Sequence, residues 1–186
     1  MAQKGIVGRG VLLDFRAWAD KNGIDFDPFT PYAISVAELD KVAADQGVAF
    51  LPGDILVIRT GLTANFRNLT FEQQEALGGG KHMAFAGVEQ SEEMLRWHWD
   101  HAFAAVCGDT YAYEAWPAKP KDDGYKVKLN HEVFLSGWGM PIGELFDLEA
   151  LSKKCAELNK YTFLLVAAPL NVTGGVASTS NTIALL

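Results

Sequence analysis

The sequence predicts an α/β domain built around a largely buried β-sheet. Four apolar runs of strand length, each containing β-branched or aromatic residues, stand out along the 186-residue chain. They cover residues 10–15, 54–60, 103–109 and 162–170. Stretches with helical end signals lie between them, and such alternation is typical of an α/β fold. Because the runs are apolar rather than alternating with polar residues, we expect these strands to be buried on both faces.

Two of the expected helices begin at capping boxes. Ser35 and Glu38 form the first box, and Gly47 ends the helix that follows it. Thr70 and Gln73 form the second box, before a helix that a run of three glycines ends. In each box two side chains satisfy backbone N–H groups at the helix start, so both helices have defined starting points.

Two further helices are expected, one from Ser91 and one after Asp147. The first helix carries the apolar residues Met94, Leu95 and Trp99. In the second helix Leu148, Leu151, Cys155 and Leu158 form one apolar stripe. Cys107 and Cys155 both have apolar neighbours, so we expect buried free thiols rather than a disulfide. The polar, proline-bearing segment 116–126 is expected to be an exposed loop, with a loop that flanks the mouth of a site as the alternative.

The composition and charge of the chain argue against several classes of protein. The net charge is −7 and no basic run occurs, which argues against nucleic acid or an anionic membrane surface as a partner. No apolar run reaches the roughly 18 residues that a membrane helix needs. No signal-peptide-like apolar region precedes Arg9. We therefore expect one cytoplasmic domain over residues 1–186 that takes a small-molecule substrate.

Several familiar catalytic patterns are missing from the sequence. Neither a phosphate-binding GxxxxGK[ST] or GxGxxG loop nor a GxSxG, HExxH or CxxC motif occurs. The chain therefore gives no support to a nucleotide-binding loop, a serine-hydrolase elbow or a structural zinc ribbon. The glycines at 78–80 and in the segment 173–178 are expected to serve as turns.

Histidines are the first candidates for chemistry, and the chain has only four: His82, His98, His101 and His131. His98 and His101 are three residues apart beside two tryptophans, so at helical spacing they share a face. As metal ligands they would need one or two more groups, and His131 with Glu144 could complete a tetrahedral set. The alternative is that they line a packed or partly open surface, with His101 facing a pocket.

Asp109 is a second candidate because it stands at the carboxyl end of a predicted strand. Polar residues there tend to face crevices in α/β sheets. Together with Glu114 it offers a general base. The alternative for an aspartate at a strand end is a role as a loop or helix cap.

His131 and Glu144 form the stronger candidate pair. They flank a glycine-rich bend in the stretch HEVFLSGWGMPIGE. Imidazole and carboxylate are both common ligands of divalent metals, and both can transfer protons. The spacing alone does not distinguish these two roles.

The whole chain resembles the putative cyclase family, most closely the fungal branch related to the metal-dependent kynurenine formamidases, with isatin hydrolase as a further relative. Four blocks carry the resemblance: GRGVLLDF at 8–15, LPGDILVIRTG at 51–61, the block 84–117, and HEVFLSGWGMPIGELFDLEAL at 131–151. The resemblance implies an α/β fold with a mixed β-sheet and flanking helices. It also implies that this chain corresponds to the C-terminal portion of the family's usual length.

The resemblance carries over two metal ligands. In metal-dependent members the histidine and glutamate of the last block bind the metal, and they map onto His131 and Glu144. Leu145 stands where asparagine is usual. The family's HxGTHxDxPxH segment, which supplies further ligands and a proton-shuttling histidine, has no counterpart here. The implied cofactor is therefore a divalent metal, zinc or manganese, in an incomplete site, or none.

The expected function is that of an enzyme acting on a small cyclic or ring-forming organic molecule, by family default through hydrolysis of an amide or ester bond. One alternative is a metal-free cyclase, isomerase or dehydratase of secondary metabolism, with acid/base catalysis from His131, Glu144, His101 or Asp109. Another is a non-catalytic remnant that binds a small molecule. A shortened domain exposes apolar surface, so we expect a homodimer or higher oligomer, as the resemblance also implies.

Overall fold

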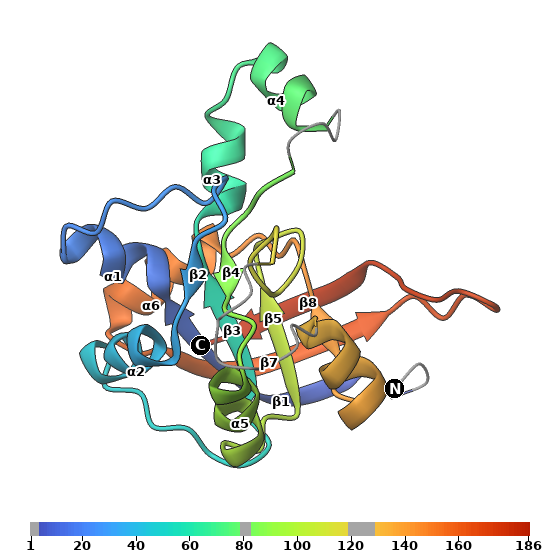
Figure 1. The fold of residues 1–186 in the computed structure, drawn as a ribbon. Coiled ribbons are helices and arrows are strands. Elements are labelled where there is room, and N and C mark those ends of the chain that lie inside the picture. The colour runs from blue at the N-terminus through green and yellow to red at the C-terminus, as the bar shows by residue number, and fades with distance from the viewer. Residues whose placement is uncertain (1–3, 79–82, 119–128) are drawn as a thin grey trace.

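A six-stranded mixed sheet forms the centre of the computed structural model, which describes residues 4–78, 83–118 and 129–186 (Figure 1). The strand order is β6-β5-β3-β1-β7-β8. Strands β6, β5, β3 and β1 are parallel, whereas β7 runs antiparallel to both β1 and β8. The strands are β1 (Ile6–Asp14), β3 (Ile55–Arg59), β5 (Ala105–Gly108), β6 (Ile142–Gly143), β7 (Thr162–Pro169) and β8 (Ser180–Leu185).

A two-stranded parallel ladder and the helices surround this sheet. The ladder pairs β2 (Ala33–Ile34) with β4 (Gly87–Val88). The α-helices are α1 (Phe15–Lys21), α2 (Val36–Asp45), α3 (Leu62–Arg67), α4 (Phe71–Gly78), α5 (Glu92–Asp100) and α6 (Glu149–Leu158), and a π-helix, η1, spans Glu132–Trp138. The α/β class with a mixed sheet and flanking helices is thus confirmed.

Three of the predicted helix starts are confirmed by their side-chain hydrogen bonds. The backbone N–H of Ser35 donates to Glu38 Oε2 at 2.8 Å, and the hydroxyl of Ser35 accepts from the Glu38 N–H at 3.3 Å. Thr70 and Gln73 make the same reciprocal pair before α4. Ser91 caps α5 by accepting from a backbone N–H of the first turn.

The central strands are buried on both faces, as expected. In β3 the side chains of Leu56 and Ile58 enter the core beneath α1, α2 and α5, whereas Ile55 and Val57 enter a second core beneath α6. The same alternation holds at the end of β1 and in β5. Both cysteines are free and buried in the second core.

The prediction for residues 162–170 is wrong in one respect, because β7 is buried on one face only. Phe163, Leu165 and Ala167 are buried, but Leu164 between them is 46% exposed. The second core covers one face of β7, while the other face lies beyond the helices that cover β1 and β3. The apolar run therefore predicts that this segment is a strand, but it does not predict how many faces of the strand are buried.

Two apolar residues of the predicted helices, Trp99 and Leu158, are largely exposed. Trp99 is 63% exposed because it lies five positions after the buried Met94, off the inner face of α5. Leu158 is 50% exposed at the end of α6, where Asn159 leaves the helix with φ of 45°. Of the segment 116–126, residues 119–126 lie outside the described residues.

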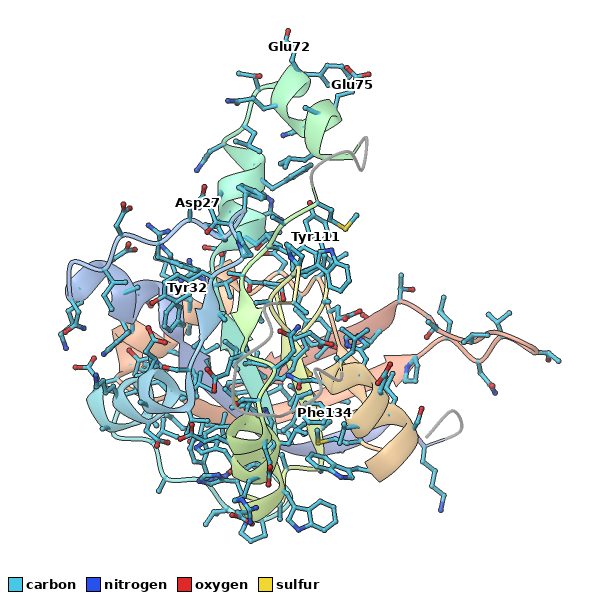
Figure 2. All side chains as sticks on the ribbon, viewed as in Figure 1. Asp27, Tyr32, Glu72, Glu75, Tyr111 and Phe134 are labelled. Carbon is cyan, nitrogen blue, oxygen red and sulfur yellow. The ribbon has the colours of Figure 1, made fainter. Side chains whose placement is uncertain are left out.

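Helices α3 and α4 form an arm that extends away from the sheet (Figure 1). The sequence patterns did not predict that these two helices form one arm. No residue of α4 is buried, and Figure 2 shows Glu72 and Glu75 pointing outward from it. Helix α1 was also not anticipated, since it follows β1 without a break and is capped by Asp14. No helix in the described part of the chain is long and apolar enough to cross a membrane.

Candidate functional site

The site is a histidine held between two carboxylates. The Nδ1 atom of His131 lies 2.7 Å from Oε2 of Glu114, and its Nε2 atom lies 2.9 Å from Oε1 of Glu144. The backbone N–H of His131 also donates to Glu114, at 3.3 Å. Glu114 is buried, whereas the side chains of His131 and Glu144 are 30% and 33% exposed. The buried carboxylate orients the ring, and the second carboxylate meets it at the surface.

His131 owes its position to the π-helix that it precedes. Phe134 of η1 is fully buried and stacks on Trp138, with ring centroids 5.0 Å apart. It also packs on His98 and Tyr113, so this turn of η1 is fixed against the core beneath α5; Figure 2 labels Phe134 there. Single π-helical turns are rare and occur often at functional sites.

Glu114 is positioned by the backbone of β4. Val88 and Glu114 form a bridge in which the Val88 N–H donates to Tyr113 O and the Ala115 N–H donates to Val88 O. Gly87 lies so close that a Cβ atom there would be 2.4 Å from the carbonyl carbon of Glu114. The absence of a side chain at Gly87 therefore lets the segment carrying Glu114 pack against β4.

Glu144 follows β6 and is fixed by the residues after it. The N–H groups of Leu145 and Phe146 donate to Thr110 O and Gly108 O, both at 3.1 Å. Leu145 adopts a φ of 54°, which is strained for leucine. The end of β5 thus holds the backbone on which Glu144 is presented to His131.

The two carboxylates raise the pKa of His131 to about 10. The hydrogen bond to Glu114 contributes most, then that to Glu144, while partial burial acts in the opposite direction. At neutral pH the ring therefore carries a proton on both nitrogens and one positive charge. This charge stabilises the folded state fully below the ordinary histidine pKa of 6.5, and the stabilisation is lost as the pH rises from there through about 10.

The donor set is short of a complete metal site. Nε2 of His131 and Oε1 of Glu144 face each other and could both turn to one ion, with Glu114 as the carboxylate that orients the ring from Nδ1. Catalytic zinc sites use three protein ligands. In residues 4–78, 83–118 and 129–186, no group of three or more His, Cys, Asp or Glu side chains could hold a metal ion. These residues do not by themselves fit a resident metal.

Asp109 is hydrogen-bonded within the fold instead of facing a crevice. Its Oδ1 accepts from the N–H and the hydroxyl of Thr60, both at 2.8 Å, and its Oδ2 accepts from Gly61 and Leu62. Burial raises the pKa of this carboxyl, and the donors from Thr60 and Gly61 oppose the rise. Asp109 therefore joins the end of β5 to the start of α3, which is the cap-like alternative.

His98 of α5 and His101, which directly follows α5, lie apart from the Glu114–His131–Glu144 cluster. His98 is buried, with Nδ1 2.8 Å from Met94 O and Nε2 2.8 Å from the Tyr113 hydroxyl; burial lowers its pKa to about 4. His101 stacks on Phe103, and its Nδ1 lies 2.8 Å from a backbone oxygen. Among the described contacts neither histidine reaches the cluster, so the structure brings His131 and Glu144 together but leaves His101 and Asp109 outside.

Sequence reasoning named Glu114 only as a companion of Asp109 and missed its contact with His131. The two residues are 17 positions apart. Their contact depends on the bridge to β4, for which the sequence offers only the glycine at position 87 as a signal. Asn130 adds to the support, since its side chain donates to Glu89 O at 3.2 Å.

The glycine at 87 gives a direct test of this support. Gly87→Ala is expected to lower the free energy of unfolding by about 1–3 kcal/mol, because the new methyl group overlaps the backbone at Glu114. Chemical denaturation measures the change. Gly78→Ala is the matched control, since a Cβ atom there meets nothing within 4 Å. Equal stability of the two variants would contradict the role assigned to Gly87.

Comparison with known proteins adds the following findings. The sequence model of the family described as putative cyclase matches residues 1–115. A crystal structure described as that of a novel cyclase shares 31% identity with a TM-score of 0.79, covering 98% of this chain and 55% of its own. No curated protein sequence matches significantly.

More distant structures share the fold. An isatin hydrolase bound to the product analogue thioisatinate has 15% identity and a TM-score of 0.60, covering 97% of this chain and 60% of its own. A structure described as a potential metal-dependent hydrolase with cyclase activity has 18% identity and a TM-score of 0.52, with coverage of 96% and 64%. The chain thus spans less than two thirds of the length of each of these three structures.

Proposed function

This chain belongs to the putative cyclase family, and from this premise we propose that it is an enzyme acting on a small cyclic or ring-forming organic molecule. The proposed reaction is hydrolysis of an amide or ester bond, with Glu114, His131 and Glu144 as the reacting group of side chains. The observation that carries the proposal is the imidazole of His131, held at both nitrogens by carboxylates and still 30% exposed.

These three side chains can move the protons that hydrolysis requires. Glu144 takes a proton from a water molecule, whose oxygen adds to the carbonyl carbon of the substrate. As the C–N or C–O bond breaks, Nε2 of His131 gives its proton to the departing nitrogen or oxygen, and Glu144 then returns a proton to Nε2. Glu114 keeps the second proton at Nδ1 and so fixes the ring in position. The water is consumed and all three side chains return to their starting states.

The names of two distant relatives support the class of reaction. Isatin hydrolase and the potential metal-dependent hydrolase with cyclase activity are named for hydrolysis or cyclisation, although at 15% and 18% identity their likeness concerns the fold. The finer assignment to a kynurenine formamidase-like fungal branch of secondary metabolism, and to the cytoplasm, stays a prediction from the sequence.

A second candidate function is ring closure or isomerisation without a metal. The observation in its favour is the donor count, since among the described residues His131 and Glu144 supply two ligands where a catalytic zinc has three. The same proton transfers, run on a substrate that carries its own nucleophile, close a ring and release water or an alcohol. A non-catalytic binding remnant is the third alternative, and it predicts that no substrate is turned over.

A substrate panel separates these functions. The purified chain is assayed against N-formyl aromatic amides, lactones, cyclic imides and their ring-opened acids, with mass spectrometry to detect gain or loss of water. We expect hydrolysis of at least one ring amide or ester. Formation of the ring from the open acid, with no hydrolysis detectable, would favour the cyclase reading. Absence of any turnover, with or without added zinc or manganese, would favour the remnant.

The metal content is predicted to be well below one equivalent per chain. Two ligands hold a divalent ion weakly, and binding must displace a proton whose pKa is about 10. Elemental analysis of tag-free protein measures bound zinc and manganese, and a chelator should leave the activity unchanged. One equivalent of metal that is lost in His131→Ala would contradict this prediction and restore metal-assisted hydrolysis as the leading mechanism.

A further inference from the structure

The C-terminal part of the chain differs from the rest in its charge. Residues 161–186 contain no Lys, Arg, Asp or Glu, so all 16 basic and 23 acidic residues fall before Tyr161. This segment comprises β7, β8 and the turn that joins them. Exposed segments of a protein surface normally carry charges, which keep copies of the protein apart in solution.

An apolar patch covers the open face of this hairpin. The sheet register pairs Val7 with Val166, Val166 with Ile183, and Leu164 with Leu185. Because directly paired residues point to the same face of a sheet, these five side chains lie together; we call them the β7–β8 patch. Val7 is 63% exposed, and Leu164, Ile183 and Leu185 are each about half exposed.

The turn of the hairpin extends the apolar surface beyond the body of the molecule. Figure 1 shows β7 and β8, in orange and red, reaching past the helices at the right of the view. Leu170, Val172 and Val176 lie in this projecting part, and all three are at least 60% exposed. An exposed segment that has no charged residue and carries three exposed apolar side chains can lie along another molecule.

We propose that the β7–β8 patch is the contact surface of a homodimer, in which the same patch of a second copy packs face to face across a two-fold axis. Charge favours a second copy as the occupant. Each chain carries a net charge of −7, so two copies repel one another over most of their surfaces, and the uncharged segment 161–186 is where they can approach. A two-fold axis places a patch against itself, which requires only that the patch be self-complementary, as an uncharged apolar face is.

Dimerisation through this patch is tested by analytical ultracentrifugation over about 1 to 100 µM chain, a range that spans ordinary dimer affinities. We expect the wild-type chain to be dimeric in this range. Ile183→Lys and Val7→Lys, on two different strands of the patch, should each weaken association about 30-fold or more. Phe71→Lys is the matched control, because Phe71 is 76% exposed on α4, away from the patch, and should leave the dimer unchanged.

Salt and hydrogen exchange provide further checks. Arg9 pairs with Leu164 in the sheet and lies on the face of the patch, but its guanidinium is bound to Asp54. The dimer contact is therefore apolar, and raising the salt from about 0.05 to 0.5 M should not weaken it. Amides of β7 and β8 should exchange more slowly at high than at low concentration in the wild-type chain, a measurement that needs no variant. A monomer throughout the range, or a dimer that both lysine variants retain with wild-type circular dichroism, would overturn the proposal. The outcome does not depend on whether the chain is an enzyme.

Discussion

Replacing Asp109 by alanine is expected to lower the free energy of unfolding by about 3–5 kcal/mol. The carboxylate of this fully buried residue accepts four hydrogen bonds from three consecutive residues, Thr60, Gly61 and Leu62. Alanine cannot accept any of them, so three backbone N–H groups and a hydroxyl lose their partner in a place that water reaches poorly. The measurement is urea denaturation followed by circular dichroism.

Two variants make this result interpretable. Asp109→Asn preserves the shape and one acceptor oxygen but turns an NH2 group toward two N–H donors, so we expect a loss smaller than that of alanine but still large. Asp147→Ala is the matched control, because Asp147 is 57% exposed in a surface pair with Arg67 and its removal should change stability little. If Asp109→Ala were as stable as Asp147→Ala, the carboxylate would be free for another role, and its candidacy as a general base would return.

Asp109 also shows which features of a residue can be predicted from the sequence and which cannot. Its place at the end of a strand was predictable from the apolar run before it. Its donors were not, because Thr60 and Gly61 follow β3, and only the pairing of β3 with β5 brings the two strand ends together. Interactions between residues close in sequence were predicted correctly, as at the capping boxes of Ser35 and Thr70.

The errors have the same origin in long-range structure. Whether β7 is covered on one face or two depends on where the helices lie. The apolar residues of β7 do not predict the positions of those helices. Helix α1 was missed because Asp14 is both the last residue of β1 and the cap of the helix that follows. At the site, the resemblance placed His131 with Glu144, while the contact with Glu114 depends on the bridge to β4.

His131→Ala is expected to lower kcat/KM for the substrate found in the panel by about 100-fold or more, with the fold retained, because proton transfer by a positioned side chain contributes about that much. The test includes a readout that a structural role would not give. Added imidazole should restore part of the activity of His131→Ala, since the variant leaves an open space between Glu114 and Glu144. His101→Ala is the control; His101 makes no described contact with this cluster, so its loss should cost less than about 10-fold.

The pH profile tests how the carboxylates act on the ring. If the protonated form of His131 gives its proton to the leaving group, activity should fall on the alkaline side near pH 10, the value to which the carboxylates raise its pKa. Glu114→Gln removes the largest contribution to that rise, so its alkaline limb should move to lower pH, while Glu144 keeps it above the ordinary value of 6.5. NMR titration of the His131 ring should report the same displacement in the absence of substrate. A pKa near 6.5 in the wild-type chain would mean that the two carboxylates do not hold the ring as the structure has them, and the proton transfer proposed for hydrolysis would lose its donor.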